Sequence, residues 1–274
     1  MGRRSGGGLK QKRSLGQVFL KVAWPVDKVC ERVKLWGATR VLEIGPGGGA
    51  LTRGLLDAGF KVTAVEKDDR FAEKLEDYKR GYVSKGNESL DIVSQDILKF
   101  DLEAWLSESK ELCAVVGNIP YNVSSPILMW VLPHLRKLKG VDFLVQLEFA
   151  QRLSANASTK SYGSLSVFSQ LRAHVELECK VGRSCFQPIP KVDSALVTLR
   201  ARSSQLDPKL LKAVEQITRL AFQQRRKKIR NSISQILTED HLKDCPIDLE
   251  RRPDSLRPAD YVELAKFIYP EIGG

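Results

Sequence analysis

The chain has 274 residues, enough for one large domain and a small one, and a formal net charge of +11, which favours polyanionic partners. No apolar stretch approaches the ~20 residues of a membrane span, and the start lacks the apolar core of a secretory signal. The 5 cysteines form no C-x-x-C pair, so we expect free thiols in a reducing compartment, either the cytoplasm or an organellar matrix or stroma.

Residues 1–16 form a predicted basic arm. They carry five cations and no acid, and the glycines at positions 6–8 favour flexibility. We expect this arm to become ordered on RNA or cofactor, while a merely solvated tail would have the same composition. A helix is predicted next, over residues 25–36.

Seven apolar runs follow along the chain, separated by stretches with helical periodicity. The predicted strands are residues 41–44, 61–66, 91–94, 113–117, 141–147, 174–181 and 194–201. Strands that alternate with helices are typical of an α/β protein. We therefore expect a doubly wound, mainly parallel, seven-stranded sheet.

The ends of the first three strands predict a nucleoside site. Residues 41–44 run into a glycine turn at 45–49 and then into a helix. Glycines let the backbone approach a ligand closely, and a helix start presents free N–H groups. The second strand ends in Glu66, a carboxylate suited to a ribose diol, and the third leads into Asp96, another acid at a strand end.

The glycine turn also matches the G-x-G-x-x-A fingerprint of dinucleotide-binding proteins, which would indicate an oxidoreductase. However, Glu43 lies two residues before the first glycine, where a carboxylate could face a cationic amino-acid group but would repel a pyrophosphate. The 3 histidines lie outside these motifs, so no acid or base for hydride transfer is visible. We therefore favour S-adenosylmethionine, a nucleoside that carries an ammonium and a sulfonium.

The fourth strand runs into Asn118-Ile119-Pro120-Tyr121. The proline has no N–H, so nearby carbonyls can converge on a ligand that donates hydrogen bonds, and the tyrosine offers a flat face for stacking. An amide, carbonyls and a ring would hold the exocyclic amine of a planar base, although an ordinary strand-ending turn uses the same residues. Ser125 and Pro126 then predict the N-cap and first residue of a helix of about ten residues.

The pattern changes after Arg200, where strand signals stop. Residues 203–205 resemble a linker, Asp207 and Pro208 are a typical helix start, and helical periodicity continues to about Ile268. A basic run without balancing acids lies in this part of the chain: Arg225, Arg226, Lys227, Lys228 and Arg230. We expect the run to contact phosphates, with a solvated helix face as the structural alternative.

Six motifs in order give the chain a resemblance to a known family. They stand at residues 16–20 (GQVFL), 41–51 (VLEIGPGGGAL), 117–121 (GNIPY), 162–167 (YGSLSV), 186–195 (FQPIPKVDSA) and 221–232 (AFQQRRKKIRNS). With these motifs the chain resembles the ribosomal RNA adenine N6,N6-dimethyltransferases of the KsgA (RsmA) type over nearly its whole length. Val18 stands where the family usually has asparagine, so a side-chain hydrogen bond is lost there while a backbone contact can survive.

The resemblance implies a Rossmann-like methyltransferase domain at residues 17–202 and a small all-helical RNA-binding domain at residues 203–274. It implies S-adenosylmethionine as the cofactor, with no metal. The family's cofactor-binding positions fall on Gln17, Val18, Leu20, Glu43, Gly45, Gly47, Glu66, Asp96 and Asn118, and its catalytic positions on Asn118, Pro120, Tyr121 and Phe186. The implied substrate is two adjacent adenosines in a hairpin near the 3′ end of small-subunit ribosomal RNA, in a pre-30S-like particle. We expect a monomer.

The implied chemistry needs no general base. The side-chain oxygen of Asn118 and a carbonyl near Pro120 would accept both N6 hydrogens of a flipped-out adenine, which localises the nitrogen lone pair. Tyr121 and Phe186 would clamp the ring, although Phe186 also suits a core position before a proline-rich turn. Two alternatives stay open at this point: a macrolide-resistance-type methylase of large-subunit RNA, and a catalytically silent RNA- or DNA-binding relative that acts as an assembly or transcription factor.

Overall fold

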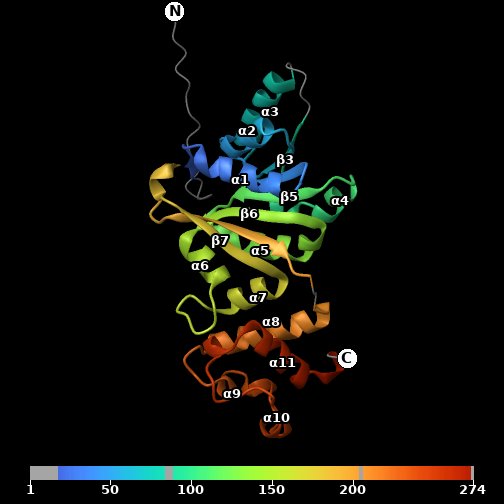
Figure 1. The fold of residues 1–274 in the computed structure, drawn as a ribbon, viewed down its shortest axis with the longest axis vertical. Coiled ribbons are helices and arrows are strands. Elements are labelled where there is room, and N and C mark those ends of the chain that lie inside the picture. Colours follow the sequence, from blue (N-terminus) through green and yellow to red (C-terminus); the bar gives the residue numbers. More distant parts are fainter. Residues whose placement is uncertain (1–17, 84–88, 204–205, 273–274) are drawn as a thin grey trace, which may run out of the picture. The chain divides into compact units, whose positions relative to one another are not determined.

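The computed structural model describes residues 18–83, 89–203 and 206–272 (Figure 1). The predicted basic arm and Gln17 lie outside the described residues, as do two positions of the expected linker. None of the described helices is long and apolar enough to cross a membrane.

The chain divides into two compact units. The first contains Met1–Leu147 and Glu178–Thr198, and the second contains Glu148–Leu177 and Leu199–Gly274. Residues 148–177 therefore cluster with the C-terminal helices rather than with the strands that precede them. The expected domain division near residue 203 stays a prediction.

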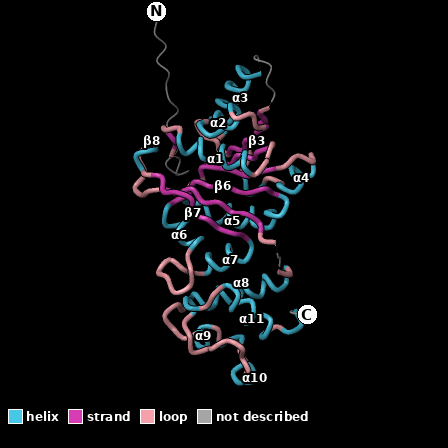
Figure 2. The backbone as a smooth tube through the Cα atoms, viewed as in Figure 1, coloured by secondary structure: helices cyan, strands magenta, loops and turns pink. Residues whose placement is uncertain are grey.

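All seven predicted strands are present in one sheet, whose order is β4-β3-β2-β5-β6-β9-β7. Figure 2 shows the strands in magenta. Their bounds are β2 Arg40–Ile44, β3 Lys61–Glu66, β4 Leu90–Ser94, β5 Cys113–Asn118, β6 Leu138–Gln146, β7 Ala173–Val181 and β9 Ser194–Ala201. The pairs β2–β3, β2–β5, β3–β4 and β5–β6 are parallel, which confirms the expected mainly parallel α/β sheet.

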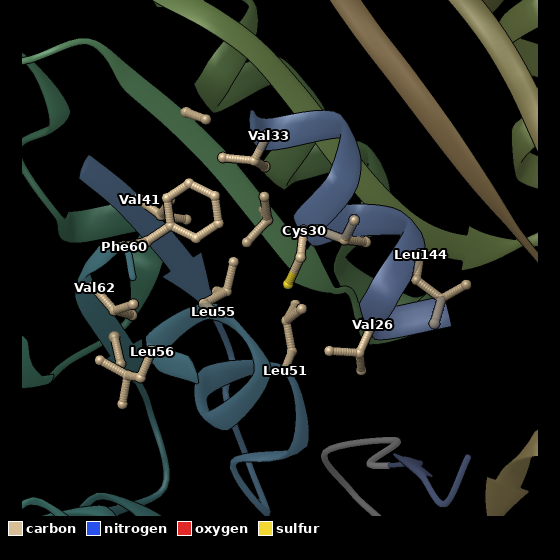
Figure 3. Close-up of a cluster of buried hydrophobic side chains, with 14 of the residues drawn as sticks. Val26, Cys30, Val33, Val41, Leu51, Leu55, Leu56, Phe60, Val62 and Leu144 are labelled. Atoms are coloured by element: carbon tan, nitrogen blue, oxygen red, sulfur yellow. The ribbon is translucent and has the colours of Figure 1, made fainter. Parts of the chain in front are cut away.

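Helices connect the strands of the first unit because the apolar residues between strands recur at helical spacing. Their bounds are α1 Trp24–Leu35, α2 Ala50–Asp57, α3 Asp69–Val83, α4 Leu102–Ser107 and α5 Ser124–Val131. Val26, Cys30 and Val33 form the buried stripe of α1 and meet Leu51 and Leu55 of α2 in one apolar cluster (Figure 3). This cluster also contains residues of β2 and β3, so it holds the glycine turn between β2 and α2 in place.

An ion-pair network ties α1 to the sheet. The guanidinium of Arg32 lies 2.8 Å from a carboxylate oxygen of Asp142 on β6 and 2.6 Å from one of Glu178 on β7. Asp142 is fully buried, and this burial raises its pKa to about 6 although the charge of Arg32 opposes the shift. The pair is therefore a buried polar contact whose two partners depend on each other.

A second, two-stranded sheet was not expected from the sequence. It pairs β1, Phe19–Leu20, antiparallel with β8, Phe186–Gln187. The expected N-cap of the helix after the fourth strand was also wrong. A 3-10 turn at Tyr121–Val123 runs directly into α5, so Ser125 lies inside the helix and takes no part in capping.

The second unit is helical around its own apolar cluster. Its helices are α6 Leu147–Ser154, α7 Ser164–Arg172, α8 Pro208–Gln223, α9 Ile229–Ser232, α10 Glu239–Lys243 and α11 Pro258–Ile268. The predicted cap at Asp207 is confirmed, because its carboxylate accepts hydrogen bonds from the N–H groups of Lys209 and Leu210 at 2.7 and 3.3 Å.

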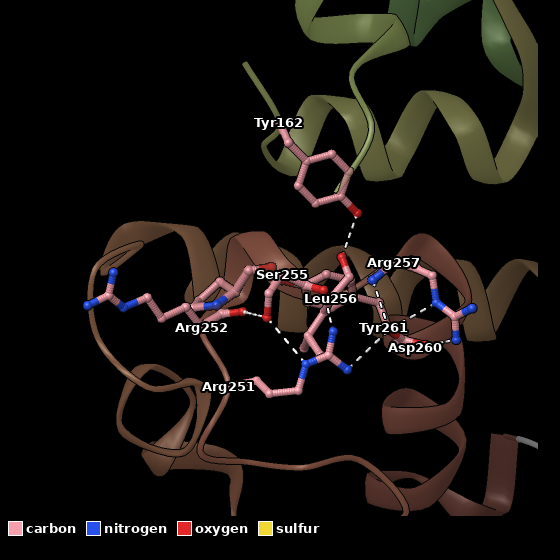
Figure 4. Close-up of polar contacts among 9 residues, drawn as sticks. Tyr162, Arg251, Arg252, Ser255, Leu256, Arg257, Asp260 and Tyr261 are labelled. Atoms are coloured by element: carbon pink, nitrogen blue, oxygen red, sulfur yellow. Dashed lines mark hydrogen bonds and ion pairs between the residues drawn. The ribbon is translucent and has the colours of Figure 1, made fainter. Parts of the chain in front are cut away.

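The motif at 162–167 contributes to this helical cluster rather than to the sheet. Tyr162 is buried with Ile217 of α8 and Tyr261 of α11, and its hydroxyl donates to the carbonyl of Leu256 at 2.8 Å (Figure 4). The Tyr261 hydroxyl donates to the carbonyl of Pro253 at 2.7 Å. The two buried phenols thus each satisfy their polar group within the second unit.

Candidate active site

The site lies where the direction of strand order reverses. β2 has β3 on one side and β5 on the other, so the carboxyl ends of β2 and β5 flank the switch point at which open α/β sheets bind ligands. A cavity of about 610 Å³ opens there. Its walls include many of the predicted site residues: Val18, Leu20, Glu43, Gly45, Gly47, Glu66, Asp96, Asn118 and Pro120.

Position 47 of the glycine turn requires glycine for two reasons. Its φ is +51°, in the left-handed region, and a β-carbon there would lie 2.6 Å from Cε1 of Phe19. The Phe19 ring also contacts Phe71 at a centroid distance of 5.3 Å. Phe19 and Phe71 line the cavity but were missed by the sequence analysis. The signal for Phe19 was its place inside the N-terminal motif.

Glu66 is held in one orientation by backbone N–H groups. Its two oxygens accept hydrogen bonds from Gly47 and Asp68, both at 2.9 Å. Burial raises the pKa of Glu66, while these N–H groups lower it and favour the carboxylate. The side chain is therefore a fixed acceptor at the end of β3.

Asp96 is already engaged by protein groups. One oxygen pairs with the Lys67 ammonium at 2.7 Å and the other accepts from the Leu98 N–H at 3.0 Å. The hydrogen bond from Lys67 is the main reason that the pKa of Asp96 lies below its usual value. A ligand at this strand end would share Asp96 with both partners.

Glu43 is buried without a full set of partners. Its Oε2 and the Oγ1 of Thr52 are buried, and neither reaches a hydrogen-bond partner among the residues that the structure describes. Burial raises the pKa of Glu43 to about 8, since the nearby Thr52 groups only partly oppose the desolvation. A buried carboxyl with one unpartnered oxygen beside the glycine turn fits a ligand that brings a cation, such as the ammonium of S-adenosylmethionine.

Asn118 ends β5 at the cavity wall. Its Nδ2 donates to the main-chain carbonyl of Val18 at 2.8 Å, across 100 positions of sequence. The neighbouring carbonyl of Pro120 accepts from the Val123 N–H at 3.1 Å and from the Ser124 hydroxyl at 3.2 Å. The amide and the proline thus meet the cavity from a turn that the start of α5 braces.

The structure does not bring the two predicted clamp aromatics to the cavity wall. The Tyr121 hydroxyl is hydrogen-bonded to the Ser194 hydroxyl at 2.7 Å, and burial raises the pKa of the phenol. Phe186 is fully buried in the cluster with α1 and α2. Phe186 lies in β8 and pairs with Leu20 of β1, so it occupies the core position that the sequence offered as the alternative.

Comparison with known proteins decides the family. The model of the family described as ribosomal RNA adenine dimethylase matches residues 8–269. The chain belongs to this family. The resemblance drawn from the six motifs is therefore confirmed, and the dinucleotide-dependent oxidoreductase is excluded.

Two curated relatives cover almost the whole chain. The ribosomal RNA small subunit methyltransferase A of Pseudomonas syringae pv. syringae (strain B728a) is 37% identical over 264 residues, which is 96% of each chain. The protein of the same name from Francisella tularensis subsp. novicida (strain U112) is 35% identical over 261 residues, 94% of this chain and 98% of its own.

Solved structures share the fold. A dimethyladenosine transferase from Plasmodium falciparum superposes with a TM-score of 0.74 at 26% identity, covering 93% of this chain and 98% of its own. The 23S rRNA methyltransferase ErmE superposes with a TM-score of 0.68 at 28% identity, covering 91% of this chain and 99% of its own. The Rossmann-like methyltransferase fold with additional C-terminal helices is confirmed.

In this dimethylase, acidic side chains pair with part of the basic run at residues 225–230. Arg225 donates to the carbonyls of Thr159 and Lys160 at 2.9 and 2.8 Å, and pairs with Asp254 at 3.4 Å. Lys228 and Arg230 both pair with Glu250, at 2.5 and 2.7 Å. The expectation that no acid balances the run was wrong, because the fold brings Glu250 and Asp254, which come later in the chain, alongside it.

Arg226 and Lys227 differ from their neighbours. Both are exposed, and neither forms an ion pair with a residue within the described ranges. Among the described residues, no group of three or more histidine, cysteine, aspartate or glutamate side chains is placed to hold a metal ion.

Proposed function

We propose that this protein transfers two methyl groups from S-adenosylmethionine to the N6 atom of adenosines in small-subunit ribosomal RNA. Family membership supports the reaction class. The observation that carries the site assignment is Asn118 at the switch point, where it lines the cavity and its amide nitrogen donates to the Val18 carbonyl. The proposed targets are two adjacent adenosines of a hairpin near the 3′ end of the RNA.

Three side chains and the glycine turn would hold the cofactor. The carboxyl of Glu43 would receive the ammonium, and the fixed oxygens of Glu66 would accept the ribose hydroxyls. Asp96 would accept from the adenine amino group of the cofactor while it keeps Lys67. Gly45 and Gly47 would let the backbone approach the methionine part, and S-adenosylmethionine supplies the electrophilic methyl group.

Asn118 and one carbonyl would activate the target amine. The Pro120 carbonyl already accepts two hydrogen bonds from the start of α5, so the carbonyl of Ile119 is the better second acceptor. Two acceptors on the N6 hydrogens draw the lone pair out of the ring and stabilise the positive charge that develops during transfer. The product ammonium is acidic enough to lose its proton to water, so no general base is required.

Tyr121 is the proposed stacking partner of the target base. Its hydroxyl is held by Ser194, which fixes the ring at the end of the N-I-P-Y turn. Phe186 would reach the base only if β1 moved off β8, so we assign it a packing role in the state described here.

The small subunit is the proposed substrate because the matched curated relatives are small-subunit methyltransferases at 35–37% identity. ErmE, whose name states 23S rRNA, shares the fold at 28% identity. We further propose a pre-30S-like particle as the target, a monomeric enzyme, and action in the cytoplasm or an organellar matrix. Arg226 and Lys227 are the proposed phosphate contacts, with Lys228 and Arg230 shared between RNA and Glu250.

The deciding experiment is methyl transfer from labelled S-adenosylmethionine to undermethylated small subunits, with large subunits in parallel and nucleoside analysis afterwards. N6,N6-dimethyladenosine in small-subunit RNA alone is the expected result. Label in large-subunit RNA would favour the macrolide-resistance type. Cofactor binding without label in either would favour a silent assembly or transcription factor.

The variant Asn118→Ala tests the site. We expect methyl transfer to fall by about 10²–10³-fold, since loss of one preorganised polar contact to the reacting centre costs that much. RNA affinity should stay near the wild-type value, because phosphate contacts dominate it. An equal loss of RNA binding and transfer would refute the amine-holding role.

A further inference from the structure

The side-chain amide of Asn118 has two faces, and only one of them suits the proposed reaction. Its oxygen can accept a hydrogen from N6 of adenine, whereas its NH2 group can only donate. A freely rotating amide would present the wrong face for part of the time. Something must therefore fix the amide orientation before the substrate arrives.

We propose that the main-chain carbonyl of Val18 is the positioning group that turns the oxygen of Asn118 toward the reacting amine. This inference rests on the proposed function. A main-chain carbonyl can only accept a hydrogen bond, so at 2.8 Å only Nδ2 of Asn118 can face Val18. The reversed amide would set two acceptor oxygens against each other at the same distance. The amide oxygen is thereby directed away from Val18, and both residues line the cavity.

The carbonyl is itself held from two sides. On one side β1 pairs with β8, with Leu20 opposite Phe186, and the Lys21 N–H donates to the Cys185 carbonyl at 2.9 Å. On the other side the Phe19 ring covers Gly47, which has no β-carbon to obstruct it. These contacts involve neither the target base nor the side chain of residue 18.

This arrangement gives the departure at Val18 a physical reason. The bond to Asn118 uses the main chain, which every residue type supplies, so valine can occupy the position without loss of the contact. It also gives the buried Phe186 a role, since Phe186 anchors β1, the strand that begins directly after Val18. The short two-stranded sheet is thus part of the catalytic geometry rather than an incidental pairing.

The variant Asn118→Asp tests the proposal through its pH profile. An ionised carboxylate would set a charged oxygen against the Val18 carbonyl, whereas a protonated carboxyl can donate its O–H there and leave its other oxygen for the amine. Single-turnover methyl transfer at saturating cofactor and RNA should therefore be lost near neutral pH. It should rise by about tenfold per unit as the pH falls toward the pKa of the new carboxyl. Wild-type transfer should show no such gain on the acid side.

Asn122→Asp is the matched control, because Asn122 lines the same cavity and, among the described residues, makes no hydrogen bond to Val18. An acid-side gain in both variants would mean that charge in the cavity, not amide orientation, sets the rate, and would overturn the proposal. A flat profile for Asn118→Asp would overturn it as well. Failure of the wild-type protein to methylate adenosine would instead refute the proposed function, so the two failures are distinguishable.

A second measurement uses the unaltered protein and does not depend on the variant's folding. In the side-chain amide spectrum of ¹⁵N-labelled protein, the two Nδ2 protons of any asparagine differ in shift, and the bond to Val18 should move one Asn118 proton further downfield. The separation between the two Asn118 protons should therefore exceed that between the two Asn122 protons. A separation for Asn118 no larger than that for Asn122 would overturn the proposal.

Discussion

At the scale of single residues, Glu43 has the least usual environment in the site. Its carboxyl is buried beside the glycine turn, its Oε2 has no partner among the residues described, and its pKa is raised to about 8. Near neutral pH the free protein therefore holds a proton on Glu43. A bound ammonium would favour the carboxylate and expel that proton.

Cofactor affinity should consequently depend on pH. Below the free pKa of about 8, binding must release the Glu43 proton, so affinity should rise with pH. The association constant for the cofactor should rise about tenfold per pH unit between about pH 6 and about pH 7.5. Titration calorimetry in two buffers of different ionisation enthalpy should detect release of about one proton.

The matched variant is Glu43→Gln, which keeps the volume and removes the titration. We expect its affinity for S-adenosylmethionine to be lower and nearly independent of pH over the same window. The same slope in both proteins would show that another group releases the proton.

At the scale of elements, the basic run divides into residues with different tasks. Arg225 joins three segments, because it bonds the 159–160 turn and pairs with Asp254, whose carbonyl also accepts from the Ser158 N–H at 2.7 Å. Arg226, next to it, is exposed and makes no ion pair with described residues. A uniform charge run in the sequence thus contains one structural arginine and its freely solvated neighbour.

Alanine substitutions should separate these tasks. Arg225→Ala should destabilise the protein by roughly 1–3 kcal/mol, the cost of leaving hydrogen-bonded partners of a charged group without it. Arg226→Ala, its control, should leave stability unchanged. Denaturant unfolding measures both, and equal effects would contradict the division.

The double variant Arg226→Ala/Lys227→Ala addresses RNA. We expect weaker binding to small-subunit RNA. The plot of the logarithm of the binding constant against the logarithm of salt concentration should be less steep by about one to two units, because each phosphate contact contributes roughly one unit to its slope. An unchanged slope in filter-binding titrations would refute the proposed phosphate contacts. Charge-preserving Arg226→Lys should retain the wild-type slope.

The ion pair of α1 provides a test of packing in the first unit. Asp142→Ala should lower the free energy of unfolding by about 3–5 kcal/mol, since it removes one partner of a buried pair and leaves the Arg32 charge poorly compensated. Glu178→Ala should cost less, because its side chain is 24% exposed and water can replace it. The reverse order of effects in denaturant unfolding would show that Glu178 is the main partner.

At the scale of the whole molecule, the chain forms two compact units whose boundaries fall at the start of α6 and within β7 and β9. The segment 148–177 supplies Tyr162 and Val167 to the cluster that also contains residues of α8 and α11. These side chains are buried only as long as the C-terminal helices are present. The helical unit therefore takes its core from two separate stretches of sequence.

Truncation after Arg202 tests the domain division expected from the sequence. We expect the shortened chain to melt at a lower temperature and to bind a hydrophobic dye, because loss of α8 and α11 exposes the apolar surface around Tyr162. The full chain is the control. An unchanged melting temperature for residues 1–202 would support the boundary near residue 203 instead.

The sequence by itself determined the features whose signal is local. Apolar runs bounded by turn residues located all seven strands of the sheet, and the Asp207-Pro208 pair located the start of α8. The ordered motifs identified the family and placed Glu43, Gly47 and Asn118 at strand ends. Strand ends can be predicted because parallel strands present their carboxyl ends to the same edge of a sheet, whatever the details of packing.

Only the tertiary structure decided which distant segments meet. Phe186 is buried because β1 pairs with β8, and Glu250 balances the basic run because the segment at 249–251 lies beside α9. The Val18 carbonyl reaches Asn118 across 100 positions of sequence. Local sequence patterns indicate which faces of an element are apolar and where the chain can turn. Contacts between distant segments depend on the free energy of the whole fold, so they leave no periodic signal along the chain.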